Sequence, residues 1–321
     1  MIQKPSLLIS FGGNALNVPD PLHSHQKEEF EIARRSMGKV VELIEKGYEK
    51  IILTHGNGPQ VGQIFLQQEL TKNEFPRQIT LDVCVADSQG RLGYILQNVF
   101  DNACQKRGLN KKSFAVITQV VVDANDRAFD NPTKPIGVFY SKDDSQKLKE
   151  ERGWEFAENS KGGFRRVVAS PIPLEIVETH IFKRIFDQNL IGIGCGGGGI
   201  PVIRKPNGEL EGVEAVIDKD RTSALLASLI GVEQLVILTN VDGAYLDFNS
   251  NQPKLIKNVS AEKMSTYIEN GEFSEGDMKP KAEAAVEFIK KGGKKVIIAS
   301  LDSLIPAMEG ESGTHIIPEK I

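Results

Sequence analysis

Three glycine-rich segments of this 321-residue chain lie next to short apolar runs. They are Gly12-Gly13-Asn14, Gly56-Asn57-Gly58 and the four consecutive glycines of 196–199. Because glycine has no Cβ, such a loop can turn through positive φ and bring several backbone N–H groups close to one anion. Any one segment could simply be a tight turn between a strand and a helix. Three together predict a site for two phosphate-like groups and something between them.

Polar residues lie beside two of these segments. His55 and Gln60 border the second one, and Lys205 follows the third. Polar atoms at the edge of a sheet need hydrogen-bond partners, which a ligand can supply. For His55, packing at the end of a strand explains the residue about as well.

Lysines stand at the expected starts of two helices. Lys219 lies between Asp218 and Asp220, and Lys281 follows Lys279. A lysine beside a helix N-terminus can reach a phosphate as a point charge, and the carboxylate of Asp220 can hold that ammonium and neighbouring lysines in place. The alternative is a solvated helix start with Asp220 as the cap. By itself, Lys281 is more typical of an ordinary surface lysine.

A further lysine, Lys134, is held between Pro132 and Pro135. Proline stiffens the backbone, which suits a lysine that must reach into a site, and a rigid exposed turn is the alternative. Cys195 precedes the four glycines, but no local base accompanies it. We therefore expect Cys195 to be a small buried residue rather than a nucleophile.

Common sequence motifs for nucleotide and metal binding are either absent from this chain or lack the structural context that they need. Gly194, Gly196 and Gly199 have the G-x-G-x-x-G spacing, but that fingerprint needs a helix at the third glycine. In this sequence Pro201 and the turn at Asn207-Gly208 favour a hairpin instead. A Walker A motif and an H-E-x-x-H motif are both absent. The sequence therefore predicts neither a P-loop nor a zinc centre.

Strands and helices that would position these residues alternate along the chain. Apolar runs predict strands at 7–10, 50–54, 114–122, 191–194, 235–238 and 295–299. Helical periodicity and breaker residues predict helices at 26–46, from Pro59, and at 81–106, 174–188, 221–230 and 281–291. This pattern predicts a three-layer αβα sandwich with a mainly parallel open sheet.

Residues 123–168 differ from the rest of the chain. Prolines and glycines interrupt charged segments there, and no long apolar period is present. We interpret 123–168 as a small protruding lid subdomain, inserted in a single domain that spans residues 1–321, and not as a second core.

The composition limits the kinds of partner. Lys and Arg number 39 against 43 Asp and Glu, a net charge of −4, which does not favour nucleic acid or an anionic membrane as the partner. The three cysteines have no C-x-x-C pair, which is typical of reduced thiols in a cytoplasmic protein. No apolar run approaches the ~20 residues of a membrane span, and the chain begins without a signal sequence.

Motifs along the whole chain resemble the amino-acid kinase family and, within it, the carbamate kinases. The segments that best distinguish carbamate kinases from their relatives are Gly-Gly-Asn-Ala, Gly-Asn-Gly-Pro-Gln-Val-Gly and Asn-Pro-Thr-Lys-Pro. Those relatives usually carry a lysine where Asn14 stands. The matching segments are 11–16, 54–62, 88–90 with 93–94, 131–137, 169–171, 197–201, 215–220 and 280–281.

The resemblance implies reversible phosphoryl transfer between ATP and carbamate, which gives ADP and carbamoyl phosphate, with Mg²⁺ carried by the nucleotide. It also implies a homodimer and a role in arginine metabolism. The catalytic residues would be Lys219, Lys281, Asp220 and Lys134. The N-terminal half would bind carbamate or carbamoyl phosphate through Gly12, Gly13, Asn14, Gly56, Asn57 and Gly58. The C-terminal half would bind ATP or ADP through Gly197, Gly198, Lys219, Thr239, Asn240, Asp242, Met278 and Lys281.

Two segments depart from the family pattern. Asp277 and Lys279 stand where Ser and Gly are usual, and Arg221-Thr222 stands where Leu-Ala is common. One alternative is therefore a catalytically weak sensor of nucleotide or carbamoyl phosphate. Another is a member of the same family that acts on an amino-acid carboxylate. An oxidoreductase is more distant, because the dinucleotide fingerprint lacks its helix.

Overall fold

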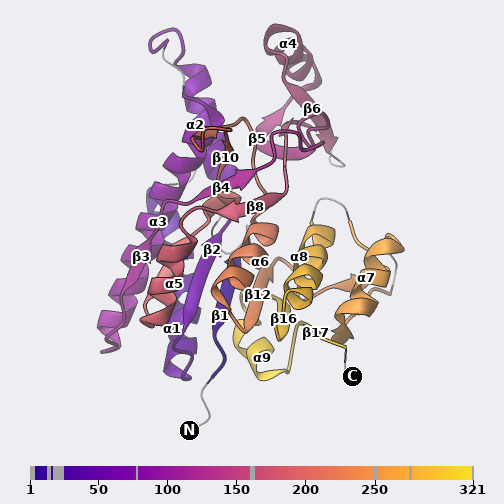
Figure 1. Ribbon diagram of the computed structural model, residues 1–321. Helices are drawn as coiled ribbons and strands as arrows, with labels where there is room; N and C mark the ends of the chain where they lie inside the picture. The colour runs from indigo at the N-terminus through magenta and orange to yellow at the C-terminus, as the bar shows by residue number, and fades with distance from the viewer. Residues whose placement is uncertain are drawn as a thin grey trace.

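An eight-stranded sheet forms the centre of the molecule (Figure 1). The computed structural model describes residues 4–12, 16, 25–76, 79–159, 163–248, 250, 252–274 and 277–319. In order across the sheet, the strands are β15 (Asn258–Ser260), β17 (Thr314–Ile317), β16 (Lys295–Ser300), β12 (Gln234–Thr239), β1 (Leu7–Phe11), β2 (Ile51–His55), β9 (Ile191–Gly194) and β3 (Ser113–Ala115). Neighbouring strands run parallel except β16 and β17, so the prediction of a mainly parallel sheet is confirmed.

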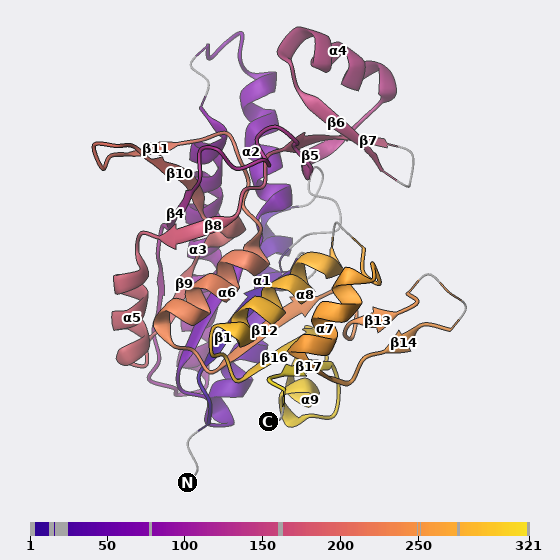
Figure 2. The ribbon, with the colours of Figure 1, turned by 45° about the vertical axis from the view of Figure 1, so that its right-hand side comes forward.

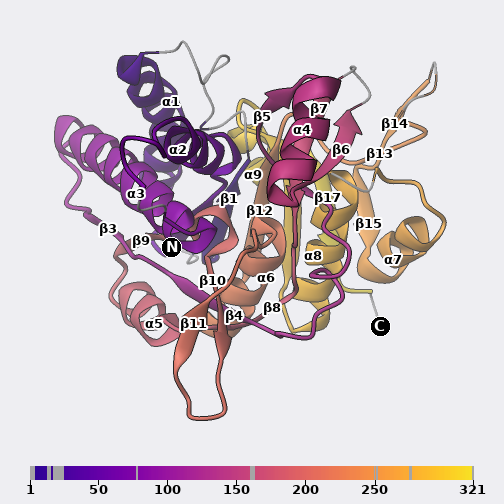
Figure 3. The same cartoon turned by 90° about the horizontal axis from the view of Figure 1, so that it is seen from above.

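Helices cover both faces of this sheet, as Figure 3 shows from above. Along β1, Leu8 belongs to one apolar cluster and Ile9 to the other, because successive side chains of a strand point to opposite faces. One cluster includes residues of α5 (Thr179–Asp187), α6 (Lys219–Ile230), α7 (Ala261–Glu269) and α8 (Met278–Lys290). The other includes residues of α1 (Gln26–Glu45), α3 (Leu81–Lys106) and α9 (Leu304–Glu309). The αβα sandwich is therefore confirmed.

A second, four-stranded sheet lies beyond the central one (Figure 2). Its order is β11 (Leu210–Gly212), β10 (Ile200–Arg204), β4 (Gln119–Val122) and β8 (Pro173–Ile176). The hairpin predicted at Asn207-Gly208 is confirmed, since β10 and β11 pair antiparallel. A small separate hairpin joins β13 (Tyr245–Leu246) to β14 (Lys254–Leu255).

Two predicted elements were wrong in this region. The single strand expected over 114–122 is divided between β3 and β4, which belong to different sheets. The helix expected from Leu174 begins only at Thr179, because β8 pairs with β4. In both places pairing with a distant strand outweighs the local sequence pattern.

The small subdomain projects from the sandwich at the top of Figure 1. A three-stranded antiparallel sheet of β5 (Lys134–Tyr140), β7 (Gly163–Val168) and β6 (Glu155–Asn159) carries α4 (Lys142–Arg152). Its backbone touches α2 (Gly58–Leu70), since a Cβ at Gly62 would lie 2.3 Å from the Cα of Gly137. Beside this contact, the guanidinium of Arg166 stacks on the rings of Phe65 and Trp154.

In the described part of the chain, no helix combines the length and apolar character that a membrane span requires.

Candidate functional site

The four-glycine loop lies at the end of β9, where it forms a short 3₁₀ turn, η2 (Gly196–Gly198). Three of its glycines have positive φ: 67° at Gly197, 91° at Gly198 and 94° at Gly199. A Cβ at Gly197 would lie 2.1 Å from the side chain of Asn57, and one at Gly198 would lie 2.3 Å from the carbonyl oxygen of Ile217. Both backbone angle and space therefore require glycine.

The contact between Asn57 and Gly197 joins the second glycine segment to the third. Asn57 follows β2, is buried, and donates from Nδ2 to Ser88 Oγ at 2.7 Å. Gln89 donates from Nε2 to the carbonyl oxygen of Gly196 at 3.0 Å. Residues of α3 thus hold the ends of β2 and β9 together. Gly58 follows Asn57 as the first residue of α2.

His55 is packed beneath this loop. A Cβ at Gly196 would lie 2.5 Å from His55 Cε1, and His55 is buried. Burial lowers the pKa of His55 to about 4, although a hydrogen bond to the carbonyl oxygen of Gly56 opposes this shift. The imidazole is therefore neutral at physiological pH and packs beneath the loop.

The first glycine segment begins at the end of β1. A Cβ at Gly12 would lie 2.4 Å from the carbonyl oxygen of Leu238, so the ends of β1 and β12 approach closely. Gly13 and Asn14 lie outside the described residues. The carboxyl ends of the parallel strands β1, β2, β9 and β12 thus meet at one edge of the sheet, which is where open α/β sheets bind ligands.

Asp220 is the centre of a buried cluster of charges at this edge. Its Oδ1 accepts a hydrogen bond from Ser10 Oγ at 3.1 Å and another from Lys219 Nζ. Its Oδ2 lies 3.6 Å from Lys281 Nζ. The stem of Lys219 passes Gly56, where a Cβ would lie 3.5 Å from Lys219 Cδ. The structure therefore brings two predicted lysines together on one carboxylate.

Asp218, not Asp220, caps helix α6. Its Oδ1 accepts from the backbone N–H groups of Asp220 at 2.9 Å and Arg221 at 3.2 Å. The capping alternative for Asp220 is therefore wrong. Asp218 Oδ2 accepts from Lys134 Nζ of β5 at 2.7 Å. Burial favours the neutral acid, but Lys134 and Lys219 outweigh burial and hold the pKa of Asp218 well below its usual range.

Lys281 is buried, so the alternative of an ordinary surface lysine is also wrong. Its ammonium donates to the carbonyl oxygen of Asp277 at 3.1 Å and forms an ion pair with the Asp277 carboxylate. Burial lowers the pKa of Lys281, but Asp220 and Asp277 outweigh burial and raise it above its usual value. The lysine thus keeps its charge between two carboxylates.

The remaining predicted nucleotide residues lie around the ends of β12 and α8. Thr239 is the last residue of β12, and Asn240 is exposed directly after it. Asp242 Oδ1 accepts from Ser300 Oγ at 3.0 Å and from Ser303 Oγ at 3.2 Å. Met278 is the first residue of α8. These residues surround the C-terminal half of the sheet edge.

Comparison with known proteins assigns the family. Residues 6–300 match the sequence profile of the Amino acid kinase family. The chain belongs to this family.

Its amino acid kinase relatives cover nearly the whole chain. It is 42% identical to the carbamate kinase of Pyrococcus horikoshii, over 97% of this chain and 99% of that protein. It is 44% identical to the carbamate kinase of Clostridium perfringens, over 97% of this chain and 99% of that protein. The structure of Giardia lamblia carbamate kinase bound to AMP-PNP has a TM-score of 0.89 at 35% identity and covers 99% of this chain and 100% of that one. The protein is thus a phosphotransferase of the kinase type.

The amino acid kinase site offers no ready metal cage. Within the ranges that the structure describes, His, Cys, Asp and Glu form no group of three suited to holding an ion. Asp218 and Asp220 both accept hydrogen bonds from lysines. These residues fit a divalent ion that arrives with a nucleotide and takes most of its oxygen ligands from phosphates and water.

Ser10 belongs to this site but was not predicted from the sequence. The only signal for it is a hydroxyl within an otherwise apolar and fully buried strand. The roles of Asp218 as helix cap and as partner of Lys134 were also missed. Both depend on contacts between distant segments.

Proposed function

We infer that this amino acid kinase is a carbamate kinase, which transfers a phosphoryl group reversibly between ATP and carbamate. ADP and carbamoyl phosphate are the products of one direction and the substrates of the other. Carbamate kinases that match nearly the full length of the chain support this function.

The main support for the mechanism is the pair of lysines that faces the Asp220 carboxylate. Phosphoryl transfer demands in-line positioning and positive charge around the moving group, with little covalent chemistry from the protein. Lys219 and Lys281 supply two such charges and converge on one buried carboxylate. In our proposal these lysines flank the transferring phosphoryl group, and Asp220 orients them without acting as a base.

In our proposal, the two substrates bind to different halves of the sheet edge. We place carbamate or carbamoyl phosphate at the ends of β1 and β2, with Gly12, Gly13, Asn14, Gly56, Asn57 and Gly58. We place the nucleotide at Gly197, Gly198, Thr239, Asn240, Asp242 and Met278. The contact of Asn57 with Gly197 supports neighbouring sites for the two substrates. Mg²⁺ would supply charge neutralisation of the nucleotide phosphates when it is bound with them.

The small subdomain acts as a lid in this proposal. It spans residues 123–168 and presents Lys134 to the site, where that lysine binds carbamoyl phosphate. The ion pair between Lys134 and Asp218 supports this role, because it places the lysine beside the start of α6 and therefore near Lys219.

We also propose a compartment, an oligomeric state and a metabolic role for the enzyme. The three cysteines are buried and free, which suits a reducing compartment such as the cytoplasm. A homodimer and a role in arginine metabolism follow from the family resemblance.

A coupled assay tests the function directly. The purified protein is mixed with Mg²⁺, ADP and carbamoyl phosphate, and ATP formation is followed. A carbamate kinase forms ATP at a rate proportional to enzyme concentration. A sensor would bind ADP in calorimetry without turnover, and a kinase of amino-acid carboxylates would require an acyl phosphate such as aspartyl phosphate instead. Either of these results would overturn the proposal.

A further inference from the structure

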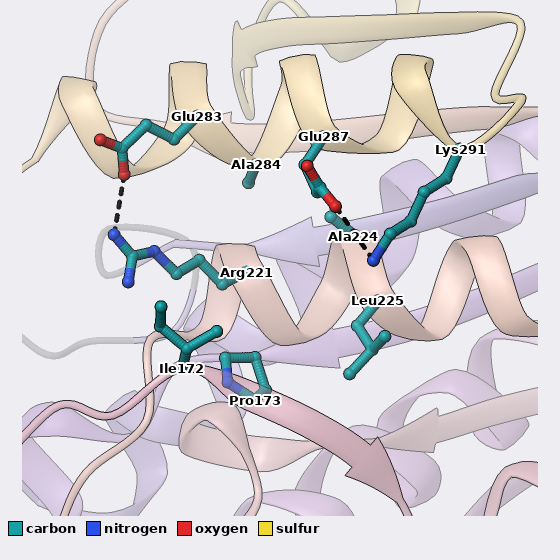
Figure 4. A pocket seen from close by; sticks show the side chains of 9 residues that line it. All are labelled: Ile172, Pro173, Arg221, Ala224, Leu225, Glu283, Ala284, Glu287 and Lys291. Carbon is teal, nitrogen blue, oxygen red and sulfur yellow. Dashed lines mark hydrogen bonds and ion pairs between the residues drawn. The ribbon is translucent and has the colours of Figure 1, made fainter. Parts of the chain in front are cut away.

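A second charged link joins helices α6 and α8 on their outer side, away from Asp220. Arg221 Nη2 lies 2.8 Å from Glu283 Oε2, and Figure 4 shows the two side chains pointing toward each other across the helices. Arg221 comes two residues after Lys219, and Glu283 comes two residues after Lys281. The pair therefore connects the same two helical turns that carry the lysines.

The space beside this pair is not filled by side chains. Arg221 and Glu283 border a hollow of about 230 Å³ between the two helices. The facing residues Ala224 and Ala284 are small, as Figure 4 shows, and the remaining lining residues are Ile172, Pro173, Leu225, Glu287 and Lys291. Ala224 and Ala284 are buried in the apolar core, so the helices pack against each other next to the hollow, and the ion pair adds a link between them on its partly exposed side.

We propose that Arg221 and Glu283 are a positioning pair, which sets the distance between Lys219 and Lys281. This inference rests on the proposed function. Displacement of a charged group by about 1 Å costs much of its effect on the transition state. On the inner side, the two helices are joined by Asp220 and Lys281 at 3.6 Å. The outer pair holds the other side, so that α8 cannot tilt away from α6.

A direct role for Arg221 makes the opposite prediction for Glu283. If Arg221 bound a substrate phosphate, Glu283 would compete with that phosphate for the guanidinium. Replacement of Glu283 by Gln would then raise the affinity for ADP or leave kcat unchanged. If the two residues position the helices, Glu283→Gln and Arg221→Gln should instead cause the same loss of kcat.

A second ion pair in the same hollow provides a matched control. Glu287 and Lys291 lie 3.1 Å apart, but Glu287 is in the last turn of α8 and Lys291 directly follows that helix, so their pair does not connect two helices (Figure 4). The experiment compares Arg221→Gln, Glu283→Gln, their double variant, the exchange Arg221→Glu/Glu283→Arg, and the control Glu287→Gln/Lys291→Gln. For each, kcat and the KM values of ADP and carbamoyl phosphate are measured in the ATP-forming direction, with Tm.

We expect each single variant to lower kcat about threefold, the rate equivalent of a partly exposed ion pair, while KM for ADP stays within about twofold. The double variant should lose no more than either single variant, the exchange should recover kcat, and the control should match wild type. Unchanged kcat in both single variants would overturn the inference, as would losses that multiply in the double variant. Wild-type protein that forms no ATP would instead overturn the proposed function.

Discussion

Lys134 Nζ lies 2.7 Å from Asp218 Oδ2, and Asp218 is the residue that caps helix α6. The first residue of the small subdomain's sheet therefore touches the residue that precedes Lys219. Since its partners hold the pKa of Asp218 below the usual range, the carboxylate is ionised at neutral pH. A ligand phosphate near Lys219 would have to compete with Asp218 for Lys134.

We expect Lys134→Ala to reduce turnover of carbamoyl phosphate much more than binding of ADP, because the lysine belongs to the subdomain and not to the nucleotide side. Steady-state kinetics and ADP calorimetry measure the two effects. Asp218 keeps its bonds to the backbone of α6, so Tm should change little. Lys142→Ala, which removes an exposed lysine of the same subdomain, is the control. Equal losses of ADP affinity and turnover would contradict the lid.

Lys219→Ala and Lys281→Ala should each lower kcat by at least about a hundredfold, comparable to the loss of one preorganised donor in a transition state. Both ammonium groups contact Asp220, so removal of either lysine also changes the interactions that hold the other one in position. The measurement is kcat for ATP formation. Lys291→Ala at the end of α8 should leave kcat unchanged. If both variants keep wild-type kcat, the assignment of the two lysines is wrong.

Asp220→Asn should lower kcat without adding a new ionisation between about pH 6 and 9, because the carboxylate orients lysines and does not accept a proton. Its amide can still accept from one lysine but no longer carries the charge that both lysines face. Helix α6 should remain formed, since its cap is Asp218. The pH profile of kcat and the circular dichroism spectrum test these points. Wild-type activity in this variant would show that the charge is dispensable.

Asp277→Ser should lower KM for ADP about threefold, since an exposed carboxylate that pairs with Lys281 competes with nucleotide phosphates for that lysine. Lys281 keeps its second partner, Asp220, and so should remain in place. Titration of ADP in the coupled assay gives KM. Glu269→Gln, an exposed change at the end of α7, controls for net charge. A higher KM would show that Asp277 helps nucleotide binding.

His55 should make the fold sensitive to mild acid. Its pKa is lowered from 6.5 to about 4 in the folded protein, so the unfolded chain takes up the proton first as pH falls. The stabilisation from neutral His55 is complete above 6.5 and is lost as pH falls from 6.5 to about 4. Urea unfolding at about pH 7.5 and 5 measures the free energy difference, which should be smaller in His55→Gln. Equal differences would mean that His55 is protonated without penalty.

Local signals were enough to predict most of the sandwich. Helix α3 has the predicted bounds, Leu81–Lys106, because a sustained apolar period ends just before Gly108. Strand β1 was recognisable because both of its faces are buried, which makes it a continuous apolar run. The division between β3 and β4, and the strand β8, were missed because they depend on partners in a second sheet.

The site was predictable as a set of residue types but not as a set of contacts. Glycines and lysines next to strand ends and helix starts indicated Gly197, Lys219 and Lys281. The hydrogen bond from Ser10 to Asp220 joins residues separated by 210 positions, and that from Lys134 to Asp218 joins residues separated by 84. Only the arrangement of the strands in space determines such pairs.

The long separation between Ser10 and Lys281, which meet through Asp220, has a consequence for synthesis of the chain on the ribosome. Strand β1 lies between β2 and β12, so one of its edges has no partner until residue 239 has been made. The nascent chain therefore carries an unpaired apolar strand through most of translation, a state that is prone to aggregation and suited to chaperone binding. It acquires both lysines of the site only when α8 leaves the ribosome.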